Sequence, residues 1–595
     1  MEEEKISLNK KRTKYCGDFT KADINKKVVV MGWVEKQRDL GNLIFIDLRD
    51  RTGTLQLAIS QTKTDEKSFQ NASICRAEFV VAATGEVRER KEKNTKIKTG
   101  EIEISVLKLE IISKSKTPPF SISNNEDVSL ELRLKYRYLD LRNEKQQQTF
   151  KTRHKIVKHT RDFFDENGFL EIETPMLIKS TPEGARDYLV PSRIHKGNFY
   201  ALPQSPQLYK QLLMVSGFDR YFQIARCFRD EDLRADRQPE FSQIDIEMSF
   251  IDVEDIISIN EKFMKSLFSK ILDIDLKTPF LKLSYNEAMN RFGCDKPDTR
   301  FSLELVSLNS IVLNSSLNIF KNAIENGGCV YALNLENKAN LISRKTLDKL
   351  NEIAKTYKAK GVFFSKILKD EVNSNFEKFL DEDEIKSIYK TTNAKENDVI
   401  LIIADEKKEI VFQSLCAIRL YLGEKFELYD KNQFSFVWVV NFPLFEYNEE
   451  EKRLVSKHHP FTMIEEKDLD KLKTAPELCH AKAYDLVLNG CEIGGGSIRI
   501  HKEDIQNEIF KTLKLTEKEI EEKFGFLVKA LQYGAPPHGG MAYGLDRLVM
   551  LMLRKNSIRD VIAFPKVQNA CELMTNSPSF VQENQLEDLN IKIKE

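Results

Sequence analysis

The sequence predicts a multidomain α+β protein: an N-terminal β-barrel, a domain built on an antiparallel sheet, and an α/β domain inserted into it. Three observations support this prediction. Short alternating strand patterns extend to residue 112, mixed helical and strand patterns begin near residue 130, and residues 301–430 are rich in Asn and Lys. The chain has 595 residues, enough for about three to five domains at roughly 100–200 residues each.

The barrel is predicted by five runs that alternate with period two and are separated by Gly, Asn and Lys turns. A helical stretch between the third and fourth runs is typical of an OB-fold. The runs are residues 28–34, 43–50, 53–60, 78–87 and 101–112. A Pro-Pro pair and a Ser/Asn cluster then indicate a linker.

The antiparallel-sheet domain begins with a helical pattern over residues 151–169, followed by a strand that ends at Pro175. Further strand patterns occupy residues 221–225, 241–250, 434–440 and 490–500. The inserted domain shows helices at 347–357 and 409–423 and strands at 361–364 and 399–404. We therefore divide the chain into a barrel (1–115), a linker (116–140), the first part of the sheet domain (141–300), the insertion (301–430), the second part (431–581) and a tail (582–595).

Composition excludes several classes of protein. Lys and Arg number 92 and Asp and Glu also number 92, so a nucleic acid can be bound only through local patches. No apolar run approaches the ~20 residues of a membrane span. The acidic start is unlike a targeting peptide, and the 9 cysteines include no CxxC pair. We expect a soluble, cytoplasmic protein with no membrane partner.

The most informative segment is CFRDEDLRADRQPEFSQIDIEMSF, residues 227–250. Its first half is an Arg-rich turn, and its second half alternates so that Phe241, Gln243, Asp245 and Glu247 share one face of a strand. An aromatic ring, an amide and two carboxylates beside arginines can stack a base, read its polar edges and hold a phosphate. The plainer alternative is a charged hairpin on a solvated face.

A second segment, PPHGGMAYGLDRLVMLMLR, covers residues 536–554. Its Gly-rich turn precedes an apolar helix that begins at Leu545, with Arg547 in the first turn. Such a helix start favours anions through its free N–H groups and its dipole. On its own, a Gly-rich turn before a buried helix is usually no more than a turn.

Together the two segments resemble the second and third signature motifs of the class II aminoacyl-tRNA synthetases. GFLEIETP (168–175) is similar to the first motif, which forms the dimer interface in that class. Further strings resemble bacterial-type aspartyl-tRNA synthetases, and the similarity covers residues 14–580. These strings are YRYLDLR (136–142), STPEGARDYLVPSR (180–193), QSPQLYKQ (204–211), FGCDKPDTRF (292–301), HHPFT (458–462) and AYDLVLNGCEIGGGSIRIH (483–501).

The resemblance implies an aspartate–tRNA ligase: ATP and L-aspartate give aspartyl-adenylate and pyrophosphate, and aspartate then passes to the 3′ end of tRNA(Asp). It also implies Mg²⁺ as cofactor and a homodimer. One alternative is a sister synthetase for asparagine or lysine, against which Arg499, Lys210 and the insertion argue. The other is a catalytically inactive nucleic-acid-binding relative, which would have lost motif residues that are present in this chain.

The resemblance also assigns roles to single residues. Arg499 and Lys210 are expected to hold the side-chain carboxylate of aspartate, and Phe241 and Arg547 to sandwich the adenine. The expected catalytic residues are Arg229, Arg547 and Glu492. The expected aspartate-binding residues are Glu183, Gln207, Lys210, Arg229, Asp245, His458 and Arg499. The expected ATP-binding residues are Arg229, Asp230, Glu231, Gln238, Phe241, Glu492, Gly544, Leu545, Asp546 and Arg547, and the expected Mg²⁺ ligands are Asp485 and Glu492.

The barrel is expected to bind the anticodon. Phe45 is the predicted platform for an unstacked base, a contact worth ~1–3 kcal/mol, although an isolated strand phenylalanine is more often a core residue. The full expected set is Arg38, Leu40, Phe45, Gln56, Lys93 and Glu103. No residue of the insertion matches a catalytic motif, and for this domain we expect a structural or tRNA-proximal role.

Two barrel positions bear on which tRNA is charged. Leu40 lies in RDLGN (38–42), where relatives with relaxed specificity tend to carry His, and Lys93 lies in ERKEKN (89–94), where they tend to carry Gly. An apolar Leu offers no hydrogen bond to the wrong base. We therefore predict an enzyme that discriminates tRNA(Asp) from tRNA(Asn). The alternatives are an enzyme that charges both, and a Leu40 that merely packs the turn beside a solvated Lys93.

Overall fold

The computed structural model describes residues 11–181, 184–233 and 236–594. The chain forms two compact units, Met1–His154 with Arg559–Phe580, and Lys155–Ile558 with Val581–Glu595. Within the described residues, no helix is both long enough and apolar enough to cross a membrane.

The first unit contains the predicted barrel, which the structure confirms as a closed five-stranded OB-fold. The strand order is β1-β2-β3-β5-β4, and β4 pairs back onto β1. Strands β3 and β5 run parallel, and the other pairs are antiparallel. The elements are β1 (Lys27–Asp39), β2 (Leu43–Asp50), β3 (Gly53–Ser60), α2 (Glu66–Ile74), β4 (Val80–Glu89) and β5 (Ile102–Ser113).

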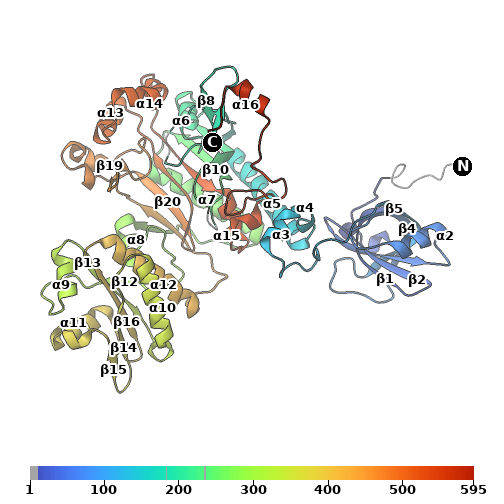
Figure 1. Ribbon diagram of the computed structural model, residues 1–595, viewed down its shortest axis with the longest axis horizontal. Helices are drawn as coiled ribbons and strands as arrows, with labels where there is room; N and C mark the ends of the chain where they lie inside the picture. The colour runs from blue at the N-terminus through green and yellow to red at the C-terminus, as the bar shows by residue number, and fades with distance from the viewer. Residues whose placement is uncertain (1–10, 182–183, 234–235, 595) are drawn as a thin grey trace. The chain divides into compact units, whose positions relative to one another are not determined.

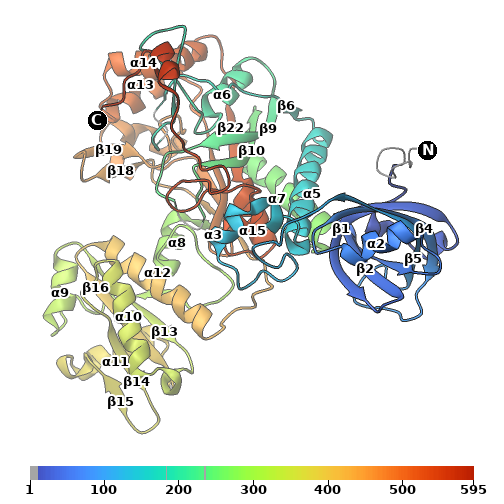
Figure 2. The same ribbon diagram turned by 45° about the vertical axis from the view of Figure 1, so that its right-hand side comes forward.

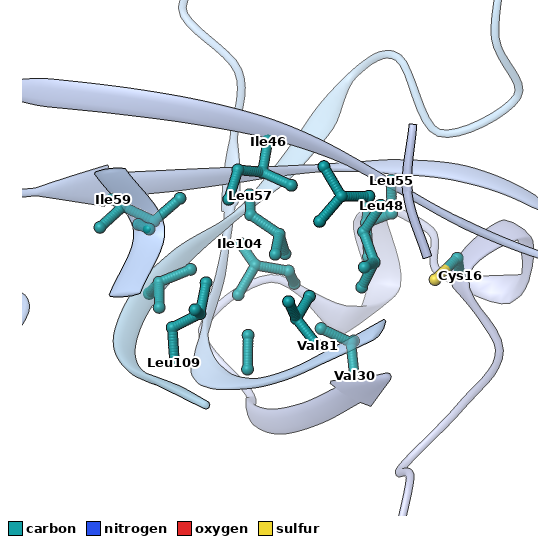
Figure 3. Close-up of a cluster of buried hydrophobic side chains, with 14 of the residues drawn as sticks. Cys16, Val30, Ile46, Leu48, Leu55, Leu57, Ile59, Val81, Ile104 and Leu109 are labelled. Atoms are coloured by element: carbon teal, nitrogen blue, oxygen red, sulfur yellow. The ribbon is translucent and has the colours of Figure 1, made fainter. Parts of the chain in front are cut away.

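Period-two alternation explains which side chains fill the barrel. Figure 3 shows Ile46, Leu48, Leu55, Leu57 and Ile59 gathered in the interior with aliphatic side chains of the other strands. The residues between them on β2 and β3 therefore face outward, because successive side chains of a strand point to opposite sides. Among these outward-facing residues, Phe45 is partly exposed, whereas Gln56 and Ala58 are buried.

The first unit also contains two short helices, α3 (Leu130–Lys135) and α4 (Arg137–Asp140), within the predicted linker. The buried Arg137 guanidinium donates hydrogen bonds to the carbonyls of Ile562 and Ala563 and pairs with Asp140. These contacts hold residues 559–580 against the linker helices, so a distant part of the chain belongs to this unit. Helix α5 (Glu144–Glu166) contributes residues to both units.

The second unit is built on the antiparallel sheet that the sequence predicts. Its eight strands have the order β11-β17-β20-β21-β22-β10-β9-β6, and only the pairs β11–β17 and β6–β9 are parallel. The predicted strand up to Pro175 is reduced to the two residues of β6. The strands are β6 (Leu170–Glu171), β9 (Arg220–Phe228), β10 (Glu240–Ser249), β11 (Leu281–Ser284), β17 (Phe436–Val440), β20 (Ala483–Leu488), β21 (Cys491–Ile498) and β22 (His538–Gly544).

Helices α5 and α7 (Val253–Leu272) cover one face of this sheet. Phe164 of α5 stacks on Phe222 of β9 at 5.5 Å between ring centroids and contacts Phe263 of α7 at 4.9 Å. Tyr543 of β22 donates its hydroxyl to Asn260 of α7 at 2.7 Å. The even-numbered residues of β10 face this layer, which leaves its odd-numbered residues for the opposite face.

Other elements surround the opposite face and the sheet edges. The helices of the second unit outside the insertion are α6 (Gln207–Val215), α7 (Val253–Leu272), α8 (Tyr285–Phe292), α13 (Glu503–Thr512), α14 (Glu517–Leu531), α15 (Leu545–Met552) and α16 (Glu583–Leu589). Two small hairpins are β7 (Leu189–Pro191) with β8 (Phe199–Ala201), and β18 (Phe445–Asn448) with β19 (Arg453–Ser456).

The insertion is a five-stranded sheet of order β12-β13-β16-β14-β15 with helices on both faces (Figures 1 and 2). Alternate residues of β13 and β16 pack on α10 and α12 on one side and on α9 and α11 on the other. The elements are β12 (Leu305–Ser307), α9 (Asn318–Glu325), β13 (Cys329–Leu335), α10 (Arg344–Thr356), β14 (Phe363–Ile367), β15 (Val372–Ser374), α11 (Glu382–Thr392), β16 (Val399–Asp405) and α12 (Lys408–Lys425).

Candidate active site

A cavity of about 750 Å³ opens on the sheet face opposite α7, over β10, β21 and the start of α15. This volume suits a ligand of the size of a nucleotide with an amino acid, since small-molecule sites typically measure ~300–1,000 Å³. Most of the sequence-predicted residues line it. They are Gln207, Lys210, Arg229, Glu231, Gln238, Phe241, Asp245, His458, Asp485, Glu492, Arg499, Gly544, Asp546 and Arg547.

Three predicted residues are not among the lining residues. Asp230 instead lies near Arg186, whose carbonyl accepts the Asp230 backbone N–H at 3.0 Å. Leu545 is 1% exposed, because it packs into the core as the first residue of α15. Glu183 lies outside the described residues.

One end of the cavity is a buried ion network of two cations and two carboxylates. Lys210 Nζ lies 2.7 Å from Asp245 Oδ1 and 3.2 Å from Glu247 Oε2. Arg499 meets Glu247 with Nε–Oε1 at 2.9 Å and Nη2–Oε2 at 3.2 Å. All four side chains are at most 2% exposed. Their charges balance, which makes burial of such a network tolerable.

The network changes how Arg499 can be used. Glu247 binds the Nε/Nη2 edge of the Arg499 guanidinium. The bidentate contact expected for the substrate carboxylate is therefore made by a residue of the protein. Nη1 contacts Ser497 Oγ and His459 Nε2, both at 2.7 Å. Burial and the nearby Arg499 lower the pKa of His459 well below its usual range, so the ring is neutral and can accept. Nη2 also lies 3.5 Å from the carbonyl oxygen of Gly540, so every N–H of Arg499 faces a protein acceptor, and a ligand carboxylate must replace one of these contacts with its own.

Three buried polar atoms of the cavity have no hydrogen-bond partner in the described part of the chain. They are Gln207 Nε2, Arg229 Nε and Asp245 Oδ2. Burying such a group without a partner costs about 1–3 kcal/mol. Two donors and one carboxylate oxygen facing one cavity therefore indicate a ligand with both anionic and cationic groups.

The opposite end of the cavity is lined by Phe241 and the first turn of α15. The Arg229 guanidinium lies 5.2 Å from the Phe241 ring centroid. Arg547 donates to the carbonyl of Glu492 at 2.6 Å and to Asp236 at 3.2 Å. The carboxylate of Asp546 accepts the backbone N–H of Ser242 at 2.9 Å, which joins α15 to β10. The arrangement provides an aromatic face and two arginines for a nucleotide.

Asp485 and Glu492 bring two carboxylates to one wall, on the hairpin formed by β20 and β21. Burial and the nearby Glu492 raise the pKa of Asp485 well above its usual value. At Gly495 an added Cβ would stand 2.2 Å from Asp485 Oδ1, so glycine is required for this carboxylate to fit. Lys296 Nζ lies 3.1 Å from Glu492 Oε2.

His458 lies beside these carboxylates. Its Nε2 is 4.0 Å from Asp485 Oδ1, and its ring packs edge-on against Phe442. Burial lowers the pKa of His458 to about 4, so this side chain is neutral at physiological pH and can donate or accept hydrogen bonds without adding charge.

Several cavity residues whose roles are not visible in the sequence lie next to the predicted ones. Glu247 was placed on the right strand face, but its pairing with Arg499 is not visible in the sequence. Lys296 and Asp295 line the cavity and belong to the string FGCDKPDTRF, which was identified without a role. Ser497 and His459 contact Arg499 directly.

The predicted anticodon residues lie on the outer face of the barrel. Arg38 pairs in register with Phe45 and its guanidinium lies 5.5 Å from that ring, so Phe45 is not a core residue. Gln56 accepts from Arg38 at 2.9 Å and donates to Glu103 at 2.6 Å. The Leu40 side chain is 70% exposed and therefore does not pack its turn.

Comparison with known proteins identifies the family. Residues 129–568 match the family described as class II tRNA synthetases (D, K and N), and residues 28–112 match the OB-fold nucleic acid binding domain. The chain belongs to the class II tRNA synthetases.

Several curated relatives narrow the comparison within that class. The chain is 56% identical over 585 residues to the aspartate–tRNA(Asp/Asn) ligase of Thermoanaerobacter pseudethanolicus, with 98% of each chain covered. It is 54% identical to the aspartate–tRNA ligase of Ruminiclostridium cellulolyticum, again with 98% of each covered.

A solved structure shares the fold at low sequence identity. The asparaginyl-tRNA synthetase of Pyrococcus horikoshii, complexed with asparaginyl-adenylate, superposes with a TM-score of 0.59 at 20% identity, covering 93% of this chain and 98% of that one.

Proposed function

We propose that this chain is an aspartate–tRNA ligase. The observation that carries the proposal is the buried end of the cavity, where Lys210 and Arg499 stand beside the unpartnered oxygen of Asp245. Two cations suit the side-chain carboxylate of aspartate, and a free carboxylate oxygen suits its α-ammonium. Asparagine would place an amide NH₂ against positive groups, which leaves donors facing donors.

In the first step, an oxygen of the substrate α-carboxylate attacks the α-phosphorus of ATP. A new P–O bond forms as the bond to pyrophosphate breaks, giving aspartyl-adenylate. Arg229, with its unpartnered Nε, is placed to hold the α-phosphate and the carboxylate together. Phe241 and Arg547 hold the adenine ring. The protein contributes positioning and neutralisation of charge rather than a covalent intermediate.

Asp485 and Glu492 fit Mg²⁺, because this ion takes one or two carboxylates and completes its shell with phosphates and water. The described residues contain no group of three or more His, Cys, Asp or Glu that could hold a metal alone. When bound, the ion would neutralise the phosphates.

In the second step, a hydroxyl of the terminal ribose of tRNA attacks the adenylate carbonyl, and AMP leaves. Neither the cavity geometry nor the motifs indicate a dedicated general base. We propose that a phosphate oxygen of the adenylate accepts the proton. The barrel binds the anticodon with Phe45 as stacking platform.

We further propose a homodimer formed through residues near 151–175. Strand β6 is an edge of the eight-stranded sheet, and Leu170 and Leu177 beside it are each 51% exposed. Sedimentation of the active enzyme should give about twice the chain mass of 69.0 kDa. A fully active monomer would exclude this interface. We also propose that this activity is cytoplasmic, in a compartment that keeps cysteine thiols reduced.

The tRNA specificity has two candidate answers. Leu40 and Lys93 support a discriminating enzyme. Three relatives that are each 56% identical are named aspartate–tRNA(Asp/Asn) ligase, which favours an enzyme that also charges tRNA(Asn). We propose discrimination, because an exposed leucine in the β1–β2 turn offers the anticodon no hydrogen bond.

The decisive experiment for the proposed activity is ATP–pyrophosphate exchange with aspartate, asparagine or lysine, followed by aminoacylation of tRNA(Asp). We expect exchange with aspartate alone. Exchange with none of the three would support a nucleic-acid-binding protein without activity, and exchange with asparagine or lysine would move the chain to a sister specificity.

A further inference from the structure

Residues 293–303 lead from α8 into the inserted domain, and Asp295 and Lys296 of this segment line the cavity. Helix α12 packs along this segment with Phe412, Cys416 and Arg419, which lie on one face at helical spacing. At Gly293 an added Cβ would stand 2.5 Å from the carbonyl oxygen of Phe412. The thiols of Cys294 and Cys416 lie close enough to shift each other's pKa, which is lowered for Cys294 and raised for Cys416. The contact is therefore close over two turns of the helix.

Arg419 is the centre of this contact. Its Nε donates to the carbonyl of Leu303 at 2.6 Å, and its Nη2 donates to the carbonyls of Asp298 and Phe301, both at 2.8 Å. The guanidinium carbon lies 3.9 Å from the Phe301 ring centroid, and the side chain is 1% exposed. A buried cation is costly. A guanidinium can bind three carbonyls at once, which an apolar side chain could not do.

The same segment reaches the hairpin that carries the two acidic residues of the cavity. Asp298 packs against the hairpin turn, where a Cβ added to Gly490 would stand 3.0 Å from the Asp298 Cβ. Two residues earlier, Lys296 enters the cavity and its Nζ lies 3.1 Å from Glu492 Oε2.

We propose that Arg419, from the inserted domain, is a positioning residue for adenylate formation. It fixes residues 293–303, so that Lys296 presents its ammonium to the cavity wall that carries Asp485 and Glu492, where the phosphates of ATP would bind. Lys296 is then a substrate-binding residue that stabilises the pyrophosphate group as it departs. This assignment rests on the proposed function. It gives the insertion a defined part in catalysis, although the insertion itself supplies no lining residue.

The first test measures ATP–pyrophosphate exchange for Arg419→Met, Arg419→Lys, Lys296→Met and the double variant Arg419→Met/Lys296→Met. We expect each single Met variant to raise the KM for ATP about tenfold and to lower kcat, with the KM for aspartate changed less than about twofold. The side chains that would bind aspartate come from α6, from β10 and from residues after β21. Residues 293–303 do not hold these elements in place. Arg419→Lys, which keeps the charge but cannot bind three carbonyls, should resemble Arg419→Met.

The double variant decides whether Arg419 acts through Lys296. If it does, the double variant should lose no more than Lys296→Met alone, whereas independent roles would give effects that multiply. Multiplying effects, or an equal rise in the KM for aspartate, would overturn the proposal. Lys296→Arg should retain most activity, because it keeps a cation in place.

A second readout does not depend on activity. Alkylation of Cys294 and Cys416 by iodoacetamide, located by mass spectrometry, reports whether the contact with α12 is closed. We expect both thiols to react faster in Arg419→Met and to remain protected in Lys296→Met.

The matched control is Ile388→Ala, which creates a cavity on the far face of the insertion, in α11. It should leave the KM for ATP and the thiol protection unchanged, and a rise in that KM would mean that any loss of stability in the insertion has the same effect. If the wild type exchanges pyrophosphate with no amino acid, the proposed function fails, while the thiol experiment still tests the contact.

Discussion

The cavity of the second unit and the outer face of the barrel both carry charged and polar side chains, but these groups are satisfied differently. In the cavity, Gln207 Nε2, Arg229 Nε and Asp245 Oδ2 are buried without partners in the described residues. On the barrel, Gln56 binds Arg38, Arg90 and Glu103, and Arg38 is exposed, although the Nε of Arg90 is buried without a partner in the described residues. The cavity is therefore preorganised for a ligand, whereas Arg38, Gln56 and Glu103 on the barrel must exchange existing hydrogen bonds for those of an RNA.

This difference sets the size of mutational effects. Removing a buried group from the cavity leaves its partner charge without compensation, which costs several kcal/mol. Removing an exposed group from the barrel leaves water in its place, and the loss is that of one contact. We therefore expect large effects on amino-acid activation and smaller, tRNA-specific effects from the barrel.

The largest effect is expected at Arg499. Arg499→Leu removes the cation that faces the substrate and leaves Glu247 paired only with Lys210. Aspartate kcat/KM should therefore fall about 100-fold or more, which is a loss of at least ~3 kcal/mol of transition-state stabilisation. Steady-state exchange kinetics measure this, with thermal unfolding to separate loss of folding from loss of binding. Arg226→Leu, which removes a surface pair with Glu240, serves as control. Near-normal aspartate activation by Arg499→Leu would refute the assignment.

The next effect concerns the hairpin glycine that makes room for Asp485. Gly495→Ala places a Cβ 2.2 Å from Asp485 Oδ1, so the carboxylate must move and exchange activity should fall by about 2 kcal/mol, or roughly thirtyfold. The Mg²⁺ concentration that gives half-maximal exchange activity should be higher for Gly495→Ala than for the wild type. Gly361→Ala, where the nearest atom would lie at 3.5 Å, should be silent. Unchanged Mg²⁺ dependence in Gly495→Ala would remove Asp485 from the metal site.

The comparison also shows what a sequence can and cannot reveal. Period-two alternation predicted the barrel strands, and Arg229, Phe241 and Arg547 were found because they lie in continuous segments. The pairing of Arg499 with Glu247 joins residues 252 positions apart, and only the sheet brings β10 and the end of β21 together. Lys296 was missed for the same reason, since its partner Glu492 lies on the other side of the insertion.

On the barrel, Phe45 should matter for tRNA and not for activation. Phe45→Ala removes the stacking face beside Arg38, and we expect tRNA kcat/KM to fall by about 1–3 kcal/mol. Pyrophosphate exchange without tRNA should be unchanged. Leu107→Ala, which shortens another partly exposed apolar side chain of the barrel, is the control. An equal loss in both variants would mean that the barrel is merely destabilised.

The smallest effect is expected at the positions that distinguish the two tRNAs. Leu40 is exposed in the β1–β2 turn, and Lys93 lies 3.3 Å from Glu89 and 3.7 Å from Glu101, so its charge is partly neutralised. Wild-type enzyme should aspartylate a tRNA(Asp) transcript with higher kcat/KM than a tRNA(Asn) transcript at matched salt. Leu40→His with Lys93→Gly should narrow that gap by about 1 kcal/mol, roughly fivefold, because a histidine can donate to or accept from the base that leucine leaves unpaired.

Each single variant shows which position acts, and exchange kinetics without tRNA should be unchanged in all of them. Comparable kcat/KM of the wild type on both transcripts would contradict discrimination and place this chain with its relatives named for both tRNAs. If the wild type discriminates and the double variant discriminates equally well, the proposed specificity stands. Barrel residues other than Leu40 and Lys93 would then produce it. The cluster of Arg38, Gln56, Arg90 and Glu103 would then be the next place to search, because these side chains already hydrogen-bond to one another and can do so differently with each anticodon.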